Sequence, residues 1–305
     1  MLKLEFGGII FKKLQEVIKQ VLEFTKMHGL GNDFIIIDAT EETPFEDNSK
    51  AAIALCNRNF GIGADGIILI VPSEKEDIKM RIFNSDGSEA EMCGNGIRCF
   101  AKYVYEKGII KKTKIKVETL AGVMEPELNL SGDTVTSVRV NMGPPRLMRD
   151  EIPMIGSEGK VISEPLKVDD TEYLITCVSM GNPHCVIMVE DLFSVSLRDI
   201  GPKIENHPVF PQKTNVEFVK VLNPEEIKMI VWERGAGETL ACGTGACASV
   251  VATAINKKTG RKVVVHLPGG DLFIEWSEDN NVYMTGPAEE VFSGQTNILT
   301  GGLRT

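Results

Sequence analysis

Short runs of apolar and β-branched residues dominate the hydrophobic pattern of the chain. They recur from one half of the sequence to the other and are bounded by glycine, proline and polar turn residues, which is typical of β-strands. Strands are therefore predicted at residues 34–37, 67–71, 78–83, 115–118, 135–140, 174–178, 185–189, 216–219, 228–232, 262–266 and 272–276.

Helical periodicity is rarer in this sequence. Helices are predicted at residues 49–57, 96–107, 197–205 and 245–258. Gly108 directly follows the second of these segments and Gly260 lies just beyond the last, as expected at helix C-termini. Because strands often follow strands directly and helices do not alternate with them, an α+β protein is predicted and a doubly wound parallel sheet is not.

The Met142-Gly143-Pro144-Pro145 segment is the predicted boundary between two domains, at residues 25–141 and 142–287. Each half contains several predicted strands and one helix that begins at a Cys-Gly turn. This arrangement suggests an internal duplication. A molecule with two lobes would place its functional site in the cleft between them.

Residues 1–24 are predicted to form an amino-terminal extension. Its apolar stripe at helical spacing consists of Leu14, Val17, Ile18, Val21 and Leu22. The stripe favours an amphipathic helix, packed on the body or on a partner, over an anchor at a membrane surface. It is too interrupted for a signal peptide or a membrane span. A start codon placed upstream of the true one is a further interpretation.

Composition and charge narrow the class of ligand. The 305 residues are 43% hydrophobic and 25% charged, as in a soluble globular protein with an ample core. The net charge of −10 leaves no basic stripe for phosphates, so nucleic acid is disfavoured, no membrane partner is expected, and a small molecule fits better. Seven cysteines without a secretion signal predict reduced thiols and a cytoplasmic protein. A homodimer is left open.

Two Cys-Gly-x-Gly segments, at residues 93–96 and 242–245, are the best indication of function. Each opens a predicted helix, and a cysteine at a helix N-terminus can have its pKa lowered from about 8.5 to roughly 3.5–7.5. One such cysteine alone is more often a buried core residue. Two of them in one pocket could act as a pair of proton carriers.

Polar residues near these segments could bind an amino acid. Arg234 offers a fork for a carboxylate and Glu233 can accept hydrogen bonds from an ammonium group, although a surface ion pair is the alternative. Asn182 and His184 lie between two predicted strands, where simple turn chemistry is the alternative. His184 could nevertheless move a proton to or from a thiol. Asn32 belongs to a glycine loop before a strand and is a further polar contact.

Together these motifs resemble the diaminopimelate epimerase family of cofactor-independent amino-acid racemases and epimerases. The resemblance runs from about residue 24 to the carboxyl terminus and rests on Gly29–Phe34, Asn84–Ser88, Cys93–Gly96, Gly181–His184, Glu233–Gly235 and Ala241–Gly245. It implies two similar α/β domains, each a curved, mostly antiparallel sheet around a central helix, with residues 288–305 returning to the first domain. The amino-terminal extension departs from the family pattern, in which the glycine loop lies very near the start.

The resemblance also implies a reaction, the interconversion of LL- and meso-diaminopimelate on the route to lysine and peptidoglycan precursors. Cys93 and Cys242 match the two catalytic acid/base cysteines, and His184 and Glu233 match groups that assist the thiols. The matching substrate-binding positions are Asn32, Asn84, Gly94, Asn95, Asn182, Asn215, Glu233, Arg234, Gly243 and Thr244. Those whose amides hold the reacting carboxylate are Gly94, Asn95, Gly243 and Thr244.

No metal or organic cofactor is indicated, since the cysteines form no Cys-x-x-Cys pair and no lysine lies in a recognisable pyridoxal context. Three alternatives stay open. A proline or hydroxyproline racemase suits Glu233, Arg234 and the asparagines less well. A thiol redox enzyme would be expected to carry Cys-x-x-Cys. A non-catalytic amino-acid-binding protein would differ by showing no turnover.

Overall fold

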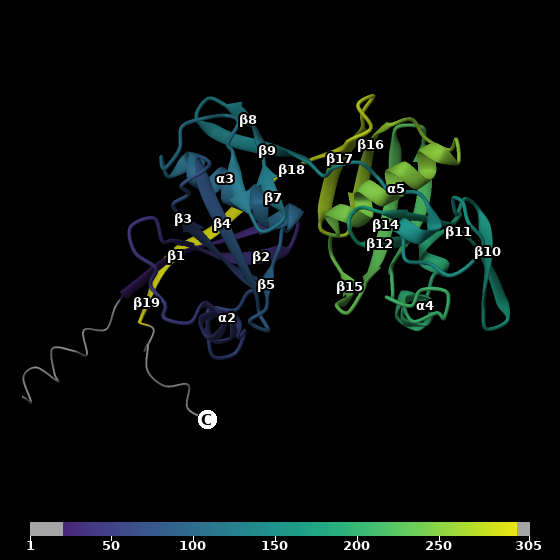
Figure 1. Cartoon of the computed structure of the whole chain (residues 1–305), viewed down its shortest axis with the longest axis horizontal. Helices are drawn as coiled ribbons and strands as arrows, with labels where there is room; N and C mark the ends of the chain where they lie inside the picture. Colours follow the sequence, from purple (N-terminus) through teal and green to yellow (C-terminus); the bar gives the residue numbers. More distant parts are fainter. Residues whose placement is uncertain (1–20, 298–305) are drawn as a thin grey trace, which may run out of the picture.

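The computed structural model describes residues 21–297 of the chain. Two lobes lie side by side, each built from a sheet that wraps around one central helix (Figure 1). The central helix is α3 (Gly94–Glu106) in the first lobe and α5 (Gly243–Ile255) in the second. The predicted α+β class with two similar domains is confirmed.

The first lobe contains an eight-stranded sheet of order β19-β1-β2-β3-β4-β6-β7, with β5 paired to β4. Its pairs are antiparallel except β2–β3 and β4–β6. The strands are β1 (Val21–Gly29), β2 (Asn32–Asp38), β3 (Gly66–Val71), β4 (Ile78–Asn84), β5 (Glu89–Ala90), β6 (Val117–Thr119), β7 (Gly122–Met124) and β19 (Glu289–Asn297).

The second lobe contains an 11-stranded sheet of order β10-β11-β12-β13-β14-β16-β17-β18-β9-β8, with β15 paired to β14. Only β12–β13 and β14–β16 are parallel. The strands are β8 (Glu127–Ser131), β9 (Thr134–Asn141), β10 (Glu164–Val168), β11 (Thr171–Ser179), β12 (Pro183–Met188), β13 (Asn215–Asn223), β14 (Glu226–Glu233), β15 (Gly237–Thr239), β16 (Lys262–Leu267), β17 (Gly270–Trp276) and β18 (Val282–Gly286).

The same sequence of elements occurs twice. In the first lobe β1 to β4 are followed by the short β5, then α3, β6 and β7. In the second lobe β11 to β14 are followed by the short β15, then α5, β16 and β17. The parallel pairs also fall at equivalent places. This topology supports the duplication predicted from the two Cys-Gly turns.

Helices on both faces of the central strands explain why these strands have continuous apolar runs. In β3, Ile68 and Ile70 pack in the core around α3, whereas Ile67 and Leu69 pack against α2 (Asn48–Cys56) on the other face. In the second lobe, α4 (Leu197–Glu205) takes the place of α2. Two short 3-10 helices, η1 (Arg149–Glu151) and η2 (Leu192–Ser194), complete the described elements.

Each predicted helix is present. α4 has the predicted bounds, and the other three have shifted ends. Both central helices begin two residues earlier than predicted, because Cys93 and Cys242 are their N-caps. The helix predicted to reach residue 258 ends at Ile255, since Lys257 has a φ of +58° and leaves the helical conformation. Lys257 thus has the left-handed conformation that a glycine often adopts after a helix end.

The amino-terminal segment differs from the prediction. Val21 and Leu22, the last residues of the predicted amphipathic stripe, begin β1 and pair with Asn297 and Thr296 of β19. A helix therefore cannot include them. The rest of that predicted helix lies outside the described residues. β19 brings residues 289–297 back to the first lobe, and residues 298–305 are also outside the described part.

Strands β9 and β18 connect the two lobes. β9 ends at Asn141, next to the predicted domain boundary, and its backbone pairs with β18 in the second sheet. Its buried side chains Val135, Val138 and Val140 nevertheless pack in the core around α3. Residues 127–141 therefore belong to the second sheet by hydrogen bonding and to the first lobe by side-chain packing.

A turn of the first lobe inserts into the second. Leu30, between β1 and β2, is 5% exposed and packs in the core cluster around α5. A Cβ on Gly270 would lie 2.8 Å from Leu30 Cδ2, and a Cβ on Gly269 would lie 2.2 Å from the Leu30 carbonyl oxygen. This close backbone approach allows no side chain at Gly269, and it fixes the turn between the lobes.

The Leu30→Ala variant is expected to lower the free energy of unfolding by about 2–4 kcal/mol, because it leaves a cavity at the junction of the lobes. Urea denaturation followed by circular dichroism measures this change. The control is Leu120→Ala, at a leucine that is 56% exposed, and it should change stability by less than about 0.5 kcal/mol. Equal losses in the two variants would contradict the role given to Leu30.

Candidate active site

The N-termini of the two central helices meet at one methionine. A Cβ on Gly94, the first residue of α3, would lie 2.8 Å from Met284 Cε, and a Cβ on Gly243, the first residue of α5, would lie 2.9 Å from Met284 Sδ. Each glycine directly follows one of the two cysteines. The structure therefore brings the two predicted Cys-Gly turns together across the junction of the lobes.

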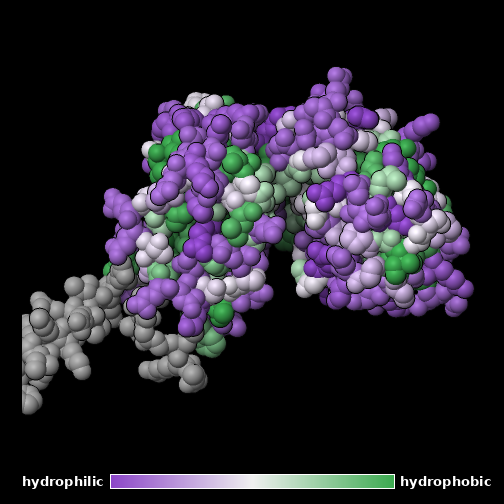
Figure 2. Space-filling model, in the orientation of Figure 1, coloured by the Kyte–Doolittle hydropathy of each residue, from purple (hydrophilic) through white to green (hydrophobic). Residues whose placement is uncertain are grey.

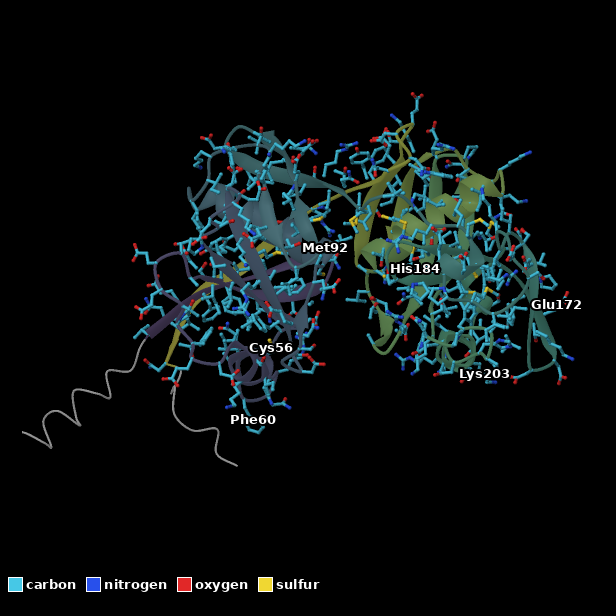
Figure 3. The ribbon with its side chains drawn as sticks, in the orientation of Figure 1. Cys56, Phe60, Met92, Glu172, His184 and Lys203 are labelled. Carbon is cyan, nitrogen blue, oxygen red and sulfur yellow. The ribbon has the colours of Figure 1, made fainter. Side chains whose placement is uncertain are left out.

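The surface is hollowed between the lobes (Figure 2). In the view of Figure 3, Met92 lies on the side of the first lobe that faces the second, and His184 on the side of the second lobe that faces the first. A cavity of about 480 Å³ adjoins this junction and is lined in part by Met92, Met142 and Tyr283.

Cys93 belongs to a small polar network in the first lobe. Its Sγ accepts from the backbone N–H of Gly96 at 3.5 Å and lies 3.7 Å from Asn32 Oδ1. Asn95 donates to the same Asn32 oxygen at 3.1 Å, and Asn32 donates to Asp65 at 2.7 Å. Asp65, which the sequence did not single out, thereby orients Asn32 toward the Cys93 turn.

Cys242 has an equivalent network in the second lobe. Its Sγ accepts from the backbone N–H of Gly245 at 3.3 Å and lies 3.5 Å from the Thr244 hydroxyl. Asn182 donates to Thr244 at 3.3 Å. Asn182 and Thr244 thus occupy the places that Asn32 and Asn95 occupy in the first lobe, and both networks place an asparagine beside a helix start.

His184 acts on this second network through Asn182. Its Nε2 lies 3.0 Å from Asn182 Oδ1, and its Nδ1 lies 2.7 Å from Glu217 Oε1. Because Asn182 donates its amide to Thr244, its oxygen accepts from His184 Nε2. The bond on the other ring nitrogen then also contains a proton, on either His184 or Glu217. Both side chains are fully buried, and Glu217 Oε2 has no hydrogen-bond partner among the described residues.

Glu233 and Arg234 lie at the end of β14. Asn215 Oδ1 accepts from the backbone N–H of Arg234 at 2.9 Å, and Asn215 in turn donates to the Pro183 carbonyl at 2.8 Å. Arg234 is exposed, and its guanidinium donates to the Gln212 carbonyl at 3.1 Å. The Thr239 hydroxyl donates to Glu233. The two residues thus form no ion pair with each other.

Asn84 is the last residue of β4, the place that Glu233 takes in β14. It is exposed, and its amide donates to Ser88 Oγ at 2.9 Å within its own turn. The structure thus places Asn84 at an equivalent end of the first lobe, outside the hydrogen-bonded network of Cys93.

Burial changes the expected electrostatics of the thiols. Desolvation raises the pKa of Cys93, and the N–H groups of Gly96 and Asn95 and the charge of Arg98 only partly oppose this. Desolvation, followed by the charges of Glu233 and Glu217, raises the pKa of Cys242 well above its usual value. The expectation of lowered thiol pKa values is therefore wrong for this structure, because burial outweighs the helix N-termini.

Burial also raises the pKa of the Glu233 carboxyl, and its hydrogen bonds with Thr239 and Cys242 oppose the rise. Glu233 is thus close enough to exchange a hydrogen bond with one of the two thiols. Residues 21–297 contain no cluster of three or more His, Cys, Asp or Glu side chains arranged to hold a metal ion. In the same residues, no helix is long and apolar enough to cross a membrane.

Besides Asp65, three residues of the site were not predicted from the sequence, which are Arg98, Glu217 and Met284. For Glu217 the available signal was a charged residue inside an apolar strand. For Arg98 it was a charged residue one turn into a buried helix. Their function depends on partners distant in sequence, such as Pro287 for Arg98 and His184 for Glu217.

Similar solved structures share this fold. A phenazine biosynthesis protein of the PhzF family from Bacillus anthracis has a TM-score of 0.67 and 17% identity, covering 92% of this chain and all of the other. A hydroxyproline epimerase from Agrobacterium vitis, with trans-4-hydroxy-L-proline bound, has a TM-score of 0.65 and 14% identity, covering 91% of this chain and 93% of the other.

Closer similarity is found in sequence. The family model described as diaminopimelate epimerase matches residues 24–148 and 176–291. The diaminopimelate epimerase of Pelotomaculum thermopropionicum is 62% identical over 90% of this chain and 98% of that protein, and that of Desulfitobacterium hafniense is 58% identical over 90% and 97%. With the fold and both cysteine turns in place, this extent of similarity shows that the chain belongs to the diaminopimelate epimerase family.

Proposed function

We propose that this chain interconverts LL- and meso-diaminopimelate, with Cys93 and Cys242 as its two acid/base groups. The observation that carries the proposal is the meeting of two helix N-termini at Met284, one from each lobe and each capped by a cysteine. Relatives at 52–62% identity that are named diaminopimelate epimerase support the substrate. The low identity to the hydroxyproline epimerase gives no support for a cyclic substrate.

The reaction requires removal of a weakly acidic α-proton from one face and delivery of a proton to the other. One thiolate takes the α-proton, and the C–H electron pair stays on the carbon as a carbanion. The opposing thiol then donates its proton to the other face of that carbon. After one turnover the two cysteines have exchanged protonation states, so the reverse reaction uses them in the opposite roles.

Backbone amides at the two helix starts would stabilise the carbanion. The first N–H groups of a helix have no intrahelical partner and attract anions. Those of Gly94, Asn95, Gly243 and Thr244 follow the cysteines directly. They can therefore bind the reacting carboxylate as negative charge grows on it, with Asn32 and Asn182 orienting the two turns.

The distal amino-acid head group fits the residues at the end of β14. Arg234 is exposed and its backbone is fixed by Asn215, so its guanidinium can bind a carboxylate in a bidentate manner. Glu233 can accept from the ammonium group while remaining near Cys242. Asn84, at the equivalent end of β4, supplies a further polar contact.

His184 assists Cys242 indirectly in this proposal. It positions Asn182, which positions the Thr244 hydroxyl beside the Cys242 thiol. Glu233 is the closer acid/base neighbour of that thiol. We place the reaction in the cytoplasm, on the route to lysine and peptidoglycan precursors, because all seven cysteines are free in the structure. A homodimer stays a prediction.

Replacing either thiol tests the mechanism. Cys93→Ala and Cys242→Ala are each expected to lower kcat for epimerisation by at least about 10³-fold, because each removes one obligatory proton carrier. Each variant should still exchange the α-hydrogen of one stereoisomer in deuterium oxide, through its remaining thiolate. Optical rotation and mass spectrometry measure the two reactions.

Cys247→Ala is the matched control, since this buried thiol lies one turn further along α5 and is expected to leave epimerisation intact. Full epimerisation in both catalytic-site variants would exclude the two-thiol mechanism. Inactivity of the unmodified chain on diaminopimelate, with activity on proline or glutamate, would instead exclude the proposed substrate.

The raised thiol pKa values predict the pH dependence of kcat/KM. The active free enzyme carries one thiolate and one thiol, and its fraction grows nearly tenfold per pH unit below the lower thiol pKa. Because burial raises both values from about 8.5, kcat/KM is expected to increase steeply between pH 6.5 and 8.5. Circular dichroism at each pH controls for unfolding. A flat profile in this range would contradict the assignment.

A further inference from the structure

Arg98 is a buried cation directly behind the Cys93 turn. It lies one turn into α3, its side chain is completely shielded from solvent, and it is the largest of the fully buried side chains. Burying an arginine costs several kcal/mol unless hydrogen bonds and charges compensate. The groups that the guanidinium touches therefore indicate why an arginine is retained at this position.

The guanidinium links the start of α3 to the chain that returns from the second lobe. Its Nη1 donates to the Gly94 carbonyl at 3.1 Å and to Asn95 Oδ1 at 3.0 Å. Its Nε donates to the carbonyl of Pro287, between β18 and β19, at 3.1 Å. Nη1 also lies 3.7 Å from Met284 Sδ, the atom against which Gly243 packs.

The geometry leaves the charge of Arg98 without a carboxylate partner. Within residues 21–297, no Asp or Glu oxygen lies within 4 Å of its nitrogens, and Nη2 has no hydrogen-bond partner. The backbone at Gly29 closes this side, because a Cβ there would lie 2.9 Å from Nη2. The ionisable groups whose charges act on Arg98 are the thiols of Cys99, Cys93 and Cys247. Of these, Cys93 is half-buried and the other two are fully buried.

The second lobe has no cation at the equivalent position. Arg98 is the fifth residue after Cys93, and the fifth residue after Cys242 is Cys247. The charged groups that act on Cys242 are the carboxylates of Glu233 and Glu217, whereas Cys93 is influenced by Arg98 from α3 and by Glu233 from β14. The two N-cap geometries are otherwise alike, with N–H···Sγ distances of 3.5 and 3.3 Å.

We propose that Arg98 is a positioning residue that holds the Cys93 turn against the Pro287 segment and supplies the positive charge that favours Cys93, over Cys242, as the thiolate of the resting enzyme. The effect of Arg98 on kcat that this inference predicts rests on the proposed function. The charge difference between the two thiols is independent of the substrate.

Three variants separate the fork, the charge and the general effect of a buried cation. Arg98→Lys keeps the charge and loses the planar fork, and Arg98→Met removes both. The matched control is Lys102→Met, which removes another buried cation from the next turn of α3. Lys102 also donates to a backbone carbonyl, that of Val135, at 2.9 Å. Circular dichroism and thermal melting establish that each variant folds.

Two measurements are made on each full-length variant. The first is the rate of alkylation of Cys93 and of Cys242 by iodoacetamide as a function of pH, read by peptide mass spectrometry. The second is kcat and KM for LL-diaminopimelate. In the unmodified chain Cys93 should reach half-maximal alkylation at a lower pH than Cys242, because the charge of Arg98 acts on Cys93, whereas the charges that act on Cys242 are those of Glu233 and Glu217.

Arg98→Met is expected to raise the alkylation midpoint of Cys93 by at least about one pH unit and to leave that of Cys242 nearly unchanged. It should lower kcat by about tenfold or more with little change in KM, because Arg98 does not touch substrate. Arg98→Lys should keep the Cys93 midpoint and lower kcat. Lys102→Met should behave like the unmodified chain in both measurements.

The proposal would be overturned if Arg98→Met had the same Cys93 alkylation midpoint and the same kcat as Lys102→Met. Unchanged kcat in Arg98→Lys would overturn only the proposed role of Arg98 in holding the Cys93 turn against the Pro287 segment. If neither Arg98 variant folds, the unmodified chain decides, since a Cys93 midpoint equal to or above that of Cys242 contradicts the charge assignment. Absence of diaminopimelate turnover in the unmodified chain would refute the proposed function and leave the alkylation result standing.

Discussion

The approach of two helix N-termini to Met284 is the constraint on which the rest of the site depends. Gly94 and Gly243 approach this side chain so closely that a Cβ at either position would require Met284 to shift. Each helix is enclosed by its own sheet, and the sheets are joined through β9 and β18, so the approach is fixed by two cores and not by a loop. A site built on such rigid elements can hold two thiols in a defined relation.

Burial of the helix starts creates an electrostatic conflict. Helix N-termini favour thiolates, yet the enclosure that brings them together desolvates the thiols and raises their pKa values. A base of raised pKa is scarcer at neutral pH but binds a proton more strongly once it is a thiolate. In the proposed mechanism, removal of a weakly acidic α-proton needs such a base, so desolvation would favour the reaction as long as some thiolate forms.

Local sequence signals were sufficient for the central elements. The continuous apolar run at residues 67–71 and the Cys-Gly turns predicted β3, α3 and α5, because these patterns reflect burial and helix capping within a few residues. β1 was misread, since Val21 and Leu22 fit a helical stripe and their strand partners lie at Thr296 and Asn297. Glu217 was missed for a similar reason: a glutamate within β13 is explained only by His184 on the neighbouring strand.

The two lobes share one topology, and the charges that act on their thiols differ. Asn32 and Asn182 occupy equivalent places and contact equivalent residues, Asn95 and Thr244, so the frame around each thiol is preserved. Two thiols in identical surroundings would have the same pKa, so neither would be favoured as the thiolate. The buried charges remove this degeneracy, since Arg98 acts on Cys93, Glu217 acts on Cys242, and Glu233 acts on both thiols. In the proposed mechanism, the symmetry of the backbone would place the two thiols on opposite faces of one carbon, and the asymmetry of buried charge would favour one of them as the thiolate.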